Sequence, residues 1–174
     1  MRLEISTIQK IAVSGIDGAD PFSIYLEDFG PGQGKITITS FDLALSRYWS
    51  HMGQQHTISS FFLKASDGYL LSKLMQGEEM REVAIDLVQE KTITEIIALR
   101  RQGSITRDKA RELYDDAQRM GSDVRDEAEL LYAVFGDDWY YSLPMRETHK
   151  CLQVIDAIKH TKAALAKLAQ EKNP

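Results

Sequence analysis

The chain has 174 residues, one cysteine, four histidines and a formal net charge of −5. That length suffices to bury a core without staples, and a single cysteine excludes a disulfide framework and a cysteine-based zinc module. The acidic balance argues against a broad basic surface for nucleic acid, and no apolar run is long enough to span a membrane.

The first fifty residues are typical of an antiparallel sheet. Short apolar runs at residues 3–8 and 11–13 predict one or two strands, and a turn rich in Gly, Asp and Pro follows at residues 16–21. Apolar and polar residues then alternate over residues 22–27 and 35–41, on either side of the sequence FGPGQG. This period of two predicts a pair of half-buried strands.

The glycine-rich loop between these two runs has two interpretations. The sequence GPGQGK superficially resembles a phosphate-binding loop, but such a loop needs a helix N-terminus after it, whereas an alternating run follows here. Glycines also serve the tight turn of a hairpin, so we expect the two strands to form an antiparallel hairpin. Looser alternation after residue 41 extends a further strand to about Trp49.

From Thr57 onward the spacing of apolar residues changes to that of helices. We expect two short helices, the second capped at Ser66, and then an amphipathic helix over residues 80–88. Thr92 and Glu95 have the spacing of a capping box, which predicts that a fresh helix begins there. The later helices are expected from Thr106 to about Gly121, from Ser122 to Phe135 and from about Met145 to Gln170.

These elements predict an α+β fold. We expect an N-terminal antiparallel sheet of three or four strands with packed helices, followed by a C-terminal helical part. Composition assigns the sheet and the short helices to residues 1–76 and the helical part to residues 77–174, and we expect the two parts to form one compact unit.

The acidic residues are concentrated in one segment. Residues 112–138 carry two basic and nine acidic side chains, a net charge of −7, whereas residues 139–174 carry a net charge of +3. Such a segment usually forms a solvated helical face, and the alternatives are attraction of a basic partner and imitation of a nucleic-acid backbone. The basic pairs and clusters, such as Arg100-Arg101, are surrounded by acids and do not predict direct nucleic-acid binding.

An aromatic loop follows the acidic segment. Trp139 and Tyr140 come directly after two aspartates, and aromatic side chains rimmed by charge suit the anchor of a protein interface. The alternative is that the loop packs Trp139 and one tyrosine against the helices. The residues that we predict to bind a protein are Asp115, Asp116, Asp126, Glu127, Asp137, Asp138, Trp139 and Tyr140.

The sequence predicts no catalytic residue, metal site or cofactor. Its paired carboxylates are adjacent in sequence, whereas acid–base chemistry needs carboxylates that converge from different elements. The histidines match no metal-ligand spacing. Cys151 lies two residues after His149, so the two side chains face different sides of a helix, and we expect Cys151 to be a small core residue.

Several stretches resemble a group of small accessory proteins of enterobacterial tailed bacteriophages and prophages. They are VSGIDG at residues 13–18, YLEDFGPGQGKITI at 25–38, YWSHMG at 48–53, TISSFFL at 57–63 and YLLSKL at 69–74, with FGDDW at 135–139 and Leu143-Pro144 as weaker matches. The resemblance implies a phage accessory protein that acts in the cytoplasm of the bacterial host. It carries over no catalytic residues.

Three hypotheses about function follow. The leading one is a non-enzymatic phage protein that binds a host or phage protein complex, as an inhibitor of a defence or nucleic-acid-processing complex in the manner of an anti-CRISPR protein. The second is a small hydrolase or nuclease whose acids converge only in the fold. The third is a self-associating module, a possible homodimer, that uses an apolar stripe on the last helix. The stripe is equally consistent with an internal core, and it is formed by Leu152, Ile155, Ile158, Leu165 and Leu168.

Overall fold

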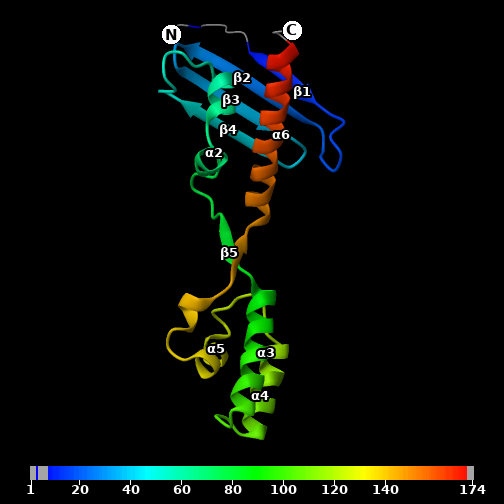
Figure 1. The fold of residues 1–174 in the computed structure, drawn as a ribbon, viewed down its shortest axis with the longest axis vertical. Helices are drawn as coiled ribbons and strands as arrows, with labels where there is room; N and C mark the ends of the chain where they lie inside the picture. The colour runs from blue at the N-terminus through cyan, green and yellow to red at the C-terminus, as the bar shows by residue number, and fades with distance from the viewer. Residues whose placement is uncertain (1–2, 4–7, 172–174) are drawn as a thin grey trace. The chain divides into compact units, whose positions relative to one another are not determined.

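The computed structural model describes residue 3 and residues 8–171 of the chain. It divides into two compact units, which are Met1–Met80 with His149–Pro174, and Arg81–Thr148. The first unit holds a sheet and three helices, and the second is mostly helical (Figure 1). The last helix therefore groups with the sheet, not with the helical segment that precedes it in sequence. Residues 4–7 of the first expected strand lie outside the described residues.

The sheet confirms the predicted α+β class and the predicted antiparallel topology. Its strands pair in the order β1-β2-β3-β4, all antiparallel. Alternate residues face the core, so Ile24 lies opposite both Ile11 and Ile38 and is fully buried. The strands are β1 (Gln9–Val13), β2 (Phe22–Gly30), β3 (Gln33–Thr39) and β4 (Ala44–Trp49).

The glycine-rich loop forms the tight hairpin turn between β2 and β3. Gly30 pairs with Gln33, which leaves Pro31 and Gly32 as the turn. Gly32 has φ +71°, a conformation that side chains with a Cβ rarely adopt, and a Cβ there would lie 2.9 Å from the carbonyl of Gly53. The predicted hairpin is thus confirmed, and a strand rather than a helix follows the loop.

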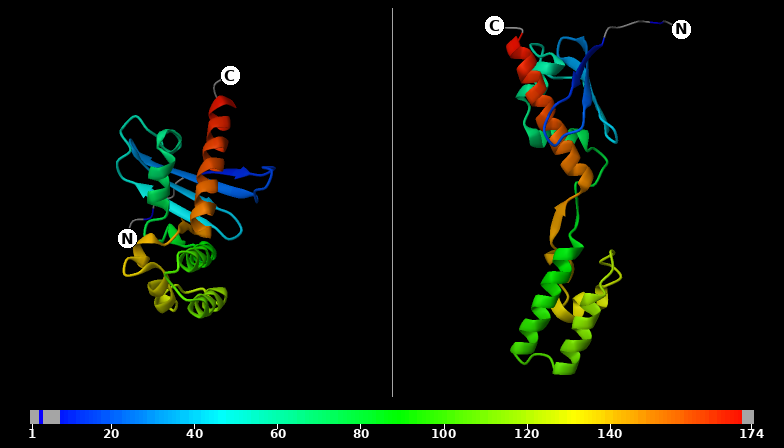
Figure 2. Two further views of the ribbon diagram at one scale, coloured as in Figure 1. Left: turned by 60° about the horizontal axis from the view of Figure 1, so that its bottom comes forward. Right: turned by 90° about the vertical axis from the view of Figure 1, so that its right-hand side faces the viewer.

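Three helices cover one face of this sheet, as the side view in Figure 2 shows. They are α1 (Ile58–Lys64), α2 (Asp67–Leu74) and α6 (His149–Glu171). Thr57 caps α1 in a capping box with Ser60, and Ser66 caps α2 as predicted. Phe62, Leu70 and Ile158 are buried between the helices and the sheet.

The stripe predicted on the last helix is not a single face. The buried residues of α6 are Cys151, Val154, Ile158, Thr161 and Leu165. Cys151 is therefore a core residue, as predicted, and Ile158 and Leu165 belong to the core of this unit. Leu152 and Ile155 are exposed instead, so they are not part of the same surface as the two buried members.

The second unit is a helical segment entered and left through a two-stranded ribbon. Arg81 pairs with Glu147 and Val83 with Met145, in antiparallel register. The helices expected at 80–88 and from Met145 are therefore wrong in their first turns. Those first residues are strands that pair with each other, and the helices begin at Ile85 and His149. The elements are β5 (Arg81–Val83), α3 (Ile85–Arg101), α4 (Arg107–Gln118), α5 (Ala128–Phe135), the 3-10 turn η1 (Trp139–Ser142) and β6 (Met145–Glu147).

Two predicted helix starts differ from the structure and one is confirmed. Thr92 does not open a helix: it is fully buried within α3, and its hydroxyl donates to the Val88 carbonyl at 2.7 Å. Residues 122–127 form turns, so the helix expected from Ser122 begins at Ala128. Thr106 caps α4 as predicted, because its hydroxyl accepts from the Lys109 N–H at 3.2 Å. No helix in the described part of the chain is long and apolar enough to cross a membrane.

Candidate functional site

The aromatic loop of the second unit is a single ordered 3-10 turn. Helix α5 ends at Gly136, whose N–H donates to the Tyr132 carbonyl at 2.8 Å and whose φ is +77°. The Asp138 carbonyl then accepts from the Tyr141 N–H at 3.1 Å, and the Ser142 hydroxyl donates to the Trp139 carbonyl at 3.1 Å. These hydrogen bonds stabilise the end of α5 and the turn η1.

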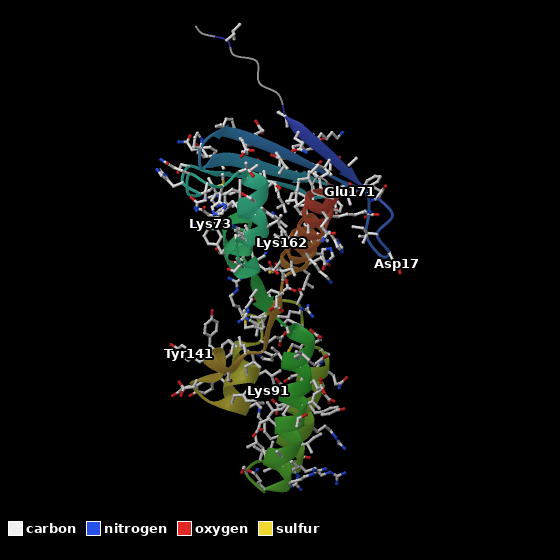
Figure 3. The ribbon with its side chains drawn as sticks, turned by 45° about the horizontal axis from the view of Figure 1, so that its top comes forward. Asp17, Lys73, Lys91, Tyr141, Lys162 and Glu171 are labelled. Atoms are coloured by element: carbon white, nitrogen blue, oxygen red, sulfur yellow. The ribbon has the colours of Figure 1, made fainter. Side chains whose placement is uncertain are left out.

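Within this turn, the tryptophan packs inward and the tyrosines face solvent. Trp139 is half-buried against the core cluster that contains Val88 and Leu131. Tyr140 and Tyr141 are 63% and 87% exposed, and Tyr141 projects freely from the ribbon in Figure 3. Each ring contacts the next one edge to face. The ring centroids are 5.7 Å apart for Trp139 and Tyr140 and 6.2 Å apart for Tyr140 and Tyr141. Trp139 thus anchors the turn, while neither tyrosine is buried.

The predicted acidic residues divide into two groups. Asp137 and Asp138 are exposed and lead directly into the turn, and Asp126 is exposed in the segment between α4 and α5. Arg125, its neighbour, is close enough to Tyr140 and Asp126 for both to raise the pKa of its guanidinium, after the larger contribution of Asp123. Asp137 and Asp138 therefore adjoin the exposed tyrosines along the chain, and Asp126 adjoins Arg125, which is close to Tyr140.

Two of the other three predicted acids have local partners, and the third lines a groove. Asp115 and Asp116 lie on α4, where Asp116 pairs with Arg119 at 2.9 Å and Asp115 lines a groove toward α3. Glu127 precedes α5, and its carboxylate accepts from the Gly121 N–H at 2.8 Å. Glu127 therefore holds the connection between α4 and α5.

A bidentate ion pair stabilises the segment between α4 and α5. Arg125 donates from Nε and a terminal nitrogen to the two oxygens of Asp123, at 3.1 and 3.0 Å. These hydrogen bonds, with the Arg125 backbone N–H at 3.0 Å, lower the pKa of the Asp123 carboxyl below its usual 3.8. The same bonds raise the pKa of Arg125. Sequence reasoning did not single out this pair.

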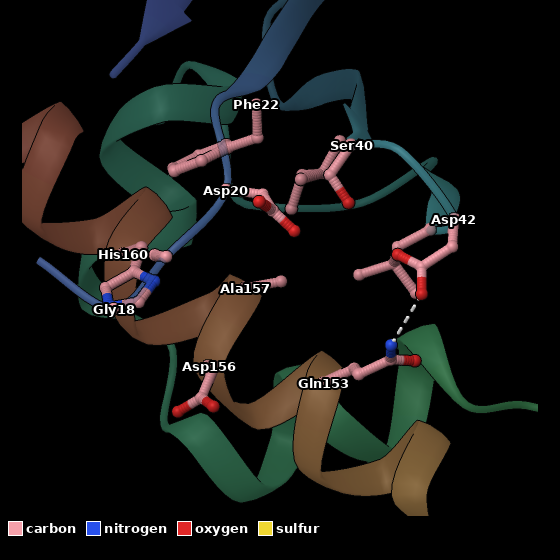
Figure 4. A pocket seen from close by; sticks show the side chains of 12 residues that line it. Gly18, Asp20, Phe22, Ser40, Asp42, Gln153, Asp156, Ala157 and His160 are labelled. Carbon is pink, nitrogen blue, oxygen red and sulfur yellow. Dashed lines mark hydrogen bonds between the residues drawn. The ribbon is translucent and has the colours of Figure 1, made fainter. Parts of the chain in front are cut away.

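Carboxylates from separate segments line one hollow in the first unit. A hollow of about 160 Å³ brings Asp20 and Asp42 from two loops beside Asp156 and His160 of α6 (Figure 4). Asp42 accepts from the Gln153 amide at 3.0 Å. In the described part of the chain, however, no group of three or more His, Cys, Asp or Glu is arranged to hold a metal ion. Sequence reasoning missed this hollow, because its residues are far apart in the chain.

A comparison with protein families decides the origin of the chain. The model of a family described as a phage family matches residues 1–166. The chain belongs to this phage protein family. The match covers the sheet and the helical unit alike, and it confirms the phage origin that the sequence resemblance implied; the enterobacterial host stays a prediction. No curated protein and no solved structure gives a significant match.

The surface around η1 combines exposed aromatic side chains with acidic ones. Two adjacent tyrosines are presented on a turn whose backbone is held by hydrogen bonds and by Trp139. Tyrosine offers a large contact area and loses little side-chain entropy on binding. We call the surface formed by Asp126, Asp137, Asp138, Tyr140 and Tyr141 the tyrosine surface.

Proposed function

We propose that this phage protein acts by binding another protein through the tyrosine surface. The exposure of Tyr140 and Tyr141 on an ordered turn carries the proposal. Aromatic side chains at the centre of an interface supply much of its binding energy, and a preordered turn reduces the entropy that binding costs. Trp139 supports this arrangement from below, since its contact with the core fixes the position of the turn.

The charge around the tyrosines favours a basic partner. The helical unit carries ten basic and fifteen acidic residues, so it accounts for the whole net charge of −5, whereas the sheet unit is neutral. Asp126, Asp137 and Asp138 place part of this negative charge at the rim of the tyrosine surface. Rim charges of this kind accelerate encounter with an oppositely charged partner and help to set orientation.

The phage origin and the acidic surface together support a class of partner. Host complexes that process or degrade nucleic acid hold it in positively charged channels, CRISPR effectors among them. An acidic surface with aromatic anchors complements the basic surface of such a complex. We infer that the protein acts in the host cytoplasm and blocks a defence or nucleic-acid-processing complex by occupying a basic surface.

The test is recovery of a partner from host cells by tagged, full-length protein. The native chain is expected to recover one host or phage complex in a fixed ratio, and to change phage or plasmid survival in cells that carry an active defence. The double variant Tyr140→Ala with Tyr141→Ala is expected to lose both effects. Truncation of two central aromatic anchors typically weakens binding by about 2 kcal/mol or more.

Tyr48→Ala is the matched control, because Tyr48 is also a large exposed aromatic, 47% exposed, but lies on the sheet unit. It should leave both recovery and survival unchanged. The proposal fails if the native chain recovers no partner in fixed ratio, or if the double variant recovers the same partner as well as the native chain does.

A further inference from the structure

A second recess lies in the helical unit, along the groove between α3 and α4. It has a volume of about 480 Å³, and apolar side chains from both helices form its floor. Ile97 and Tyr114 remain 40% and 39% exposed there, so the two helices do not bury these side chains between them. The residues of the floor are Ile96, Ile97, Ala110 and Tyr114.

Three arginines line the same groove. Arg100 and Arg101 come from the last turn of α3, and Arg111 from the second turn of α4. The C-terminal dipole of α3 favours the first two, but Arg111 is far from the C-terminus of its own helix. Asp115 is the carboxylate among the lining residues, so the groove is positive within a unit of net charge −5.

Among the described residues, five of the ten cations of the unit form ion pairs, and the three arginines of the groove are not among them. In the described part of the chain, no ion pair involves Arg100, Arg101 or Arg111. The cations of the unit that do pair with carboxylates are Arg81, Lys109, Arg119, Arg125 and Arg146. Fifteen acidic residues are available in the unit, yet the three guanidinium groups of the groove stay exposed to solvent.

We propose that the groove between α3 and α4 binds an acidic segment of a partner protein that carries an apolar side chain among its carboxylates. The apolar side chain would cover Ile97 and Tyr114, and the carboxylates would pair with Arg100, Arg101 and Arg111. Guanidinium groups suit this role because they bind carboxylates through two parallel hydrogen bonds. The proposal rests on the protein-binding function and adds a second, positive contact surface to the tyrosine surface.

The apolar floor distinguishes such a segment from nucleic acid. Phosphate groups would neutralise the arginines but leave the exposed Ile97 uncovered, and a strand with a charge on every nucleotide would bring more negative charge into this acidic unit. The carboxylates of a protein segment would pair with the arginines, and its apolar side chain would cover the apolar floor. The mixture of exposed apolar surface and unpaired arginines is therefore complementary to an acidic, amphipathic segment.

Fluorescence anisotropy with the full-length protein tests the proposal. The probe is a labelled amphipathic peptide with leucine and glutamate at helical spacing, and its counterpart has glutamine in place of every glutamate. We expect the glutamate peptide to bind about tenfold more tightly, since each of three ion pairs at a partly exposed site contributes modestly to binding. This preference should shrink at high salt.

Charge-reversed variants locate the site. The pair Arg100→Glu with Arg111→Glu is expected to remove the preference for the glutamate peptide. The pair Lys159→Glu with Lys167→Glu makes the same charge change on exposed positions of α6 and should retain it. Thermal unfolding of each variant checks the fold, and the comparison of the two peptides on the native chain does not depend on any variant.

Four outcomes would overturn the proposal. The first two are equal binding of the two peptides and tighter binding of a single-stranded DNA of similar length. The third is retention of the preference in the variant of Arg100 and Arg111. The fourth is a concentration-dependent dimer that this variant abolishes, which would make a second copy of the chain the occupant of the groove. Tyr140→Ala with Tyr141→Ala should leave peptide binding unchanged. Partner recovery that depends on the tyrosines, without any peptide preference, would reject the groove and keep the proposed function.

Discussion

Two buried threonines lie on helices, and they differ in whether the hydroxyl group has a hydrogen-bond partner. Thr92 and Thr161 are both fully buried. The Thr92 hydroxyl donates to the Val88 carbonyl one turn earlier in α3. The Thr161 hydroxyl, on α6, has no hydrogen-bond partner among the described residues. A buried hydroxyl without a partner loses its bonds to water and gains nothing in return.

Thr161→Val is therefore expected to stabilise the protein. The substitution keeps the branched shape and removes the unsatisfied hydroxyl, so the free energy of unfolding should rise by about 1 kcal/mol. Urea unfolding followed by circular dichroism measures the change. Thr92→Val is the matched control and should not stabilise the protein, because its hydroxyl is satisfied. A loss of stability in the Thr161 variant would contradict the expectation.

The Asp123–Arg125 pair predicts a pH effect at the segment beside the tyrosine surface. The pKa of Asp123 in the folded protein is lowered by hydrogen bonds from Arg125. The ion pair therefore stabilises the folded protein fully above pH 3.8, the usual pKa of the carboxyl. This stabilisation is lost as the pH falls through the lower pKa of the folded state. Carbon NMR of the Asp123 carboxyl should give a midpoint below 3.8 that rises in Arg125→Ala. An unchanged midpoint in this variant would exclude Arg125 as the cause.

At the scale of elements, the close contact of β3 with α1 depends on a glycine. A Cβ at Gly34 would lie 2.8 Å from the Ile58 Cβ and 3.1 Å from the Glu27 carbonyl oxygen. The strand carries Gly34 against the first residue of the helix, whose N–H donates to the Asp28 carboxylate of β2 at 2.7 Å. Helix and hairpin are thus joined at a point with no room for a side chain.

Gly34→Ala is expected to lower the free energy of unfolding by about 1 to 3 kcal/mol, because neither the backbone nor a buried isoleucine is free to move away. Gly68→Ala is the control. Gly68 lies in α2 with open space around its Cβ position, and alanine favours a helix, so this change should be neutral or stabilising. Denaturant unfolding of the two variants provides the comparison, and equal effects would contradict it.

Local signals predicted some elements correctly and others not. The β2–β3 hairpin and the caps at Ser66 and Thr106 were predictable, because a turn or a cap is determined by a few adjacent residues. The capping-box pattern at Thr92 misled, since the apolar period of α3 runs through it and buries the residue. The β5–β6 ribbon was not predictable, because each of its strands has three residues and its partner lies about sixty positions away.

The candidate site could be predicted only in part, because burial and ion pairing depend on residues that are distant in the chain. Trp139 and Tyr140 stand out in sequence as aromatics next to acids, but their opposite burial depends on the packing of η1 against the core. Asp115 lines the α3–α4 groove, which its sequence neighbours do not indicate, and its role in protein binding stays a prediction. The arginines of that groove were visible as basic clusters, while their lack of ion pairs required side-chain positions.

At the scale of the whole molecule, the helical unit is an insertion between α2 and α6. The sheet unit takes residues from both sides of it, and the pairing of β5 with β6 brings the two crossing points of the chain together. Antiparallel strands lie about 5 Å apart, so a few residues suffice to bridge them. The core of the sheet unit contains members from α1, α2 and α6 and none from residues 81–148.

Replacement of residues 81–148 by a short Gly/Ser linker is expected to leave a folded sheet unit. The variant should unfold cooperatively in urea and retain the near-ultraviolet circular dichroism of buried Trp49. A broad, non-cooperative transition would show that the sheet unit depends on the helical unit. The same variant should lose the protein binding that we assign to the tyrosine surface, which lies wholly within the removed residues.

The amino-acid sequence by itself determined the α+β class, the meander with its hairpin turn, most helix positions, and the acidic and aromatic character of the 112–141 segment. All of these depend on residues a few positions apart, where period, turn chemistry and capping act directly. Tertiary structure alone decided that α6 joins the sheet, that Trp139 is anchored while Tyr140 and Tyr141 are exposed, and that three arginines gather unpaired over an apolar groove. These features depend on contacts between segments distant in the chain, which local patterns do not encode.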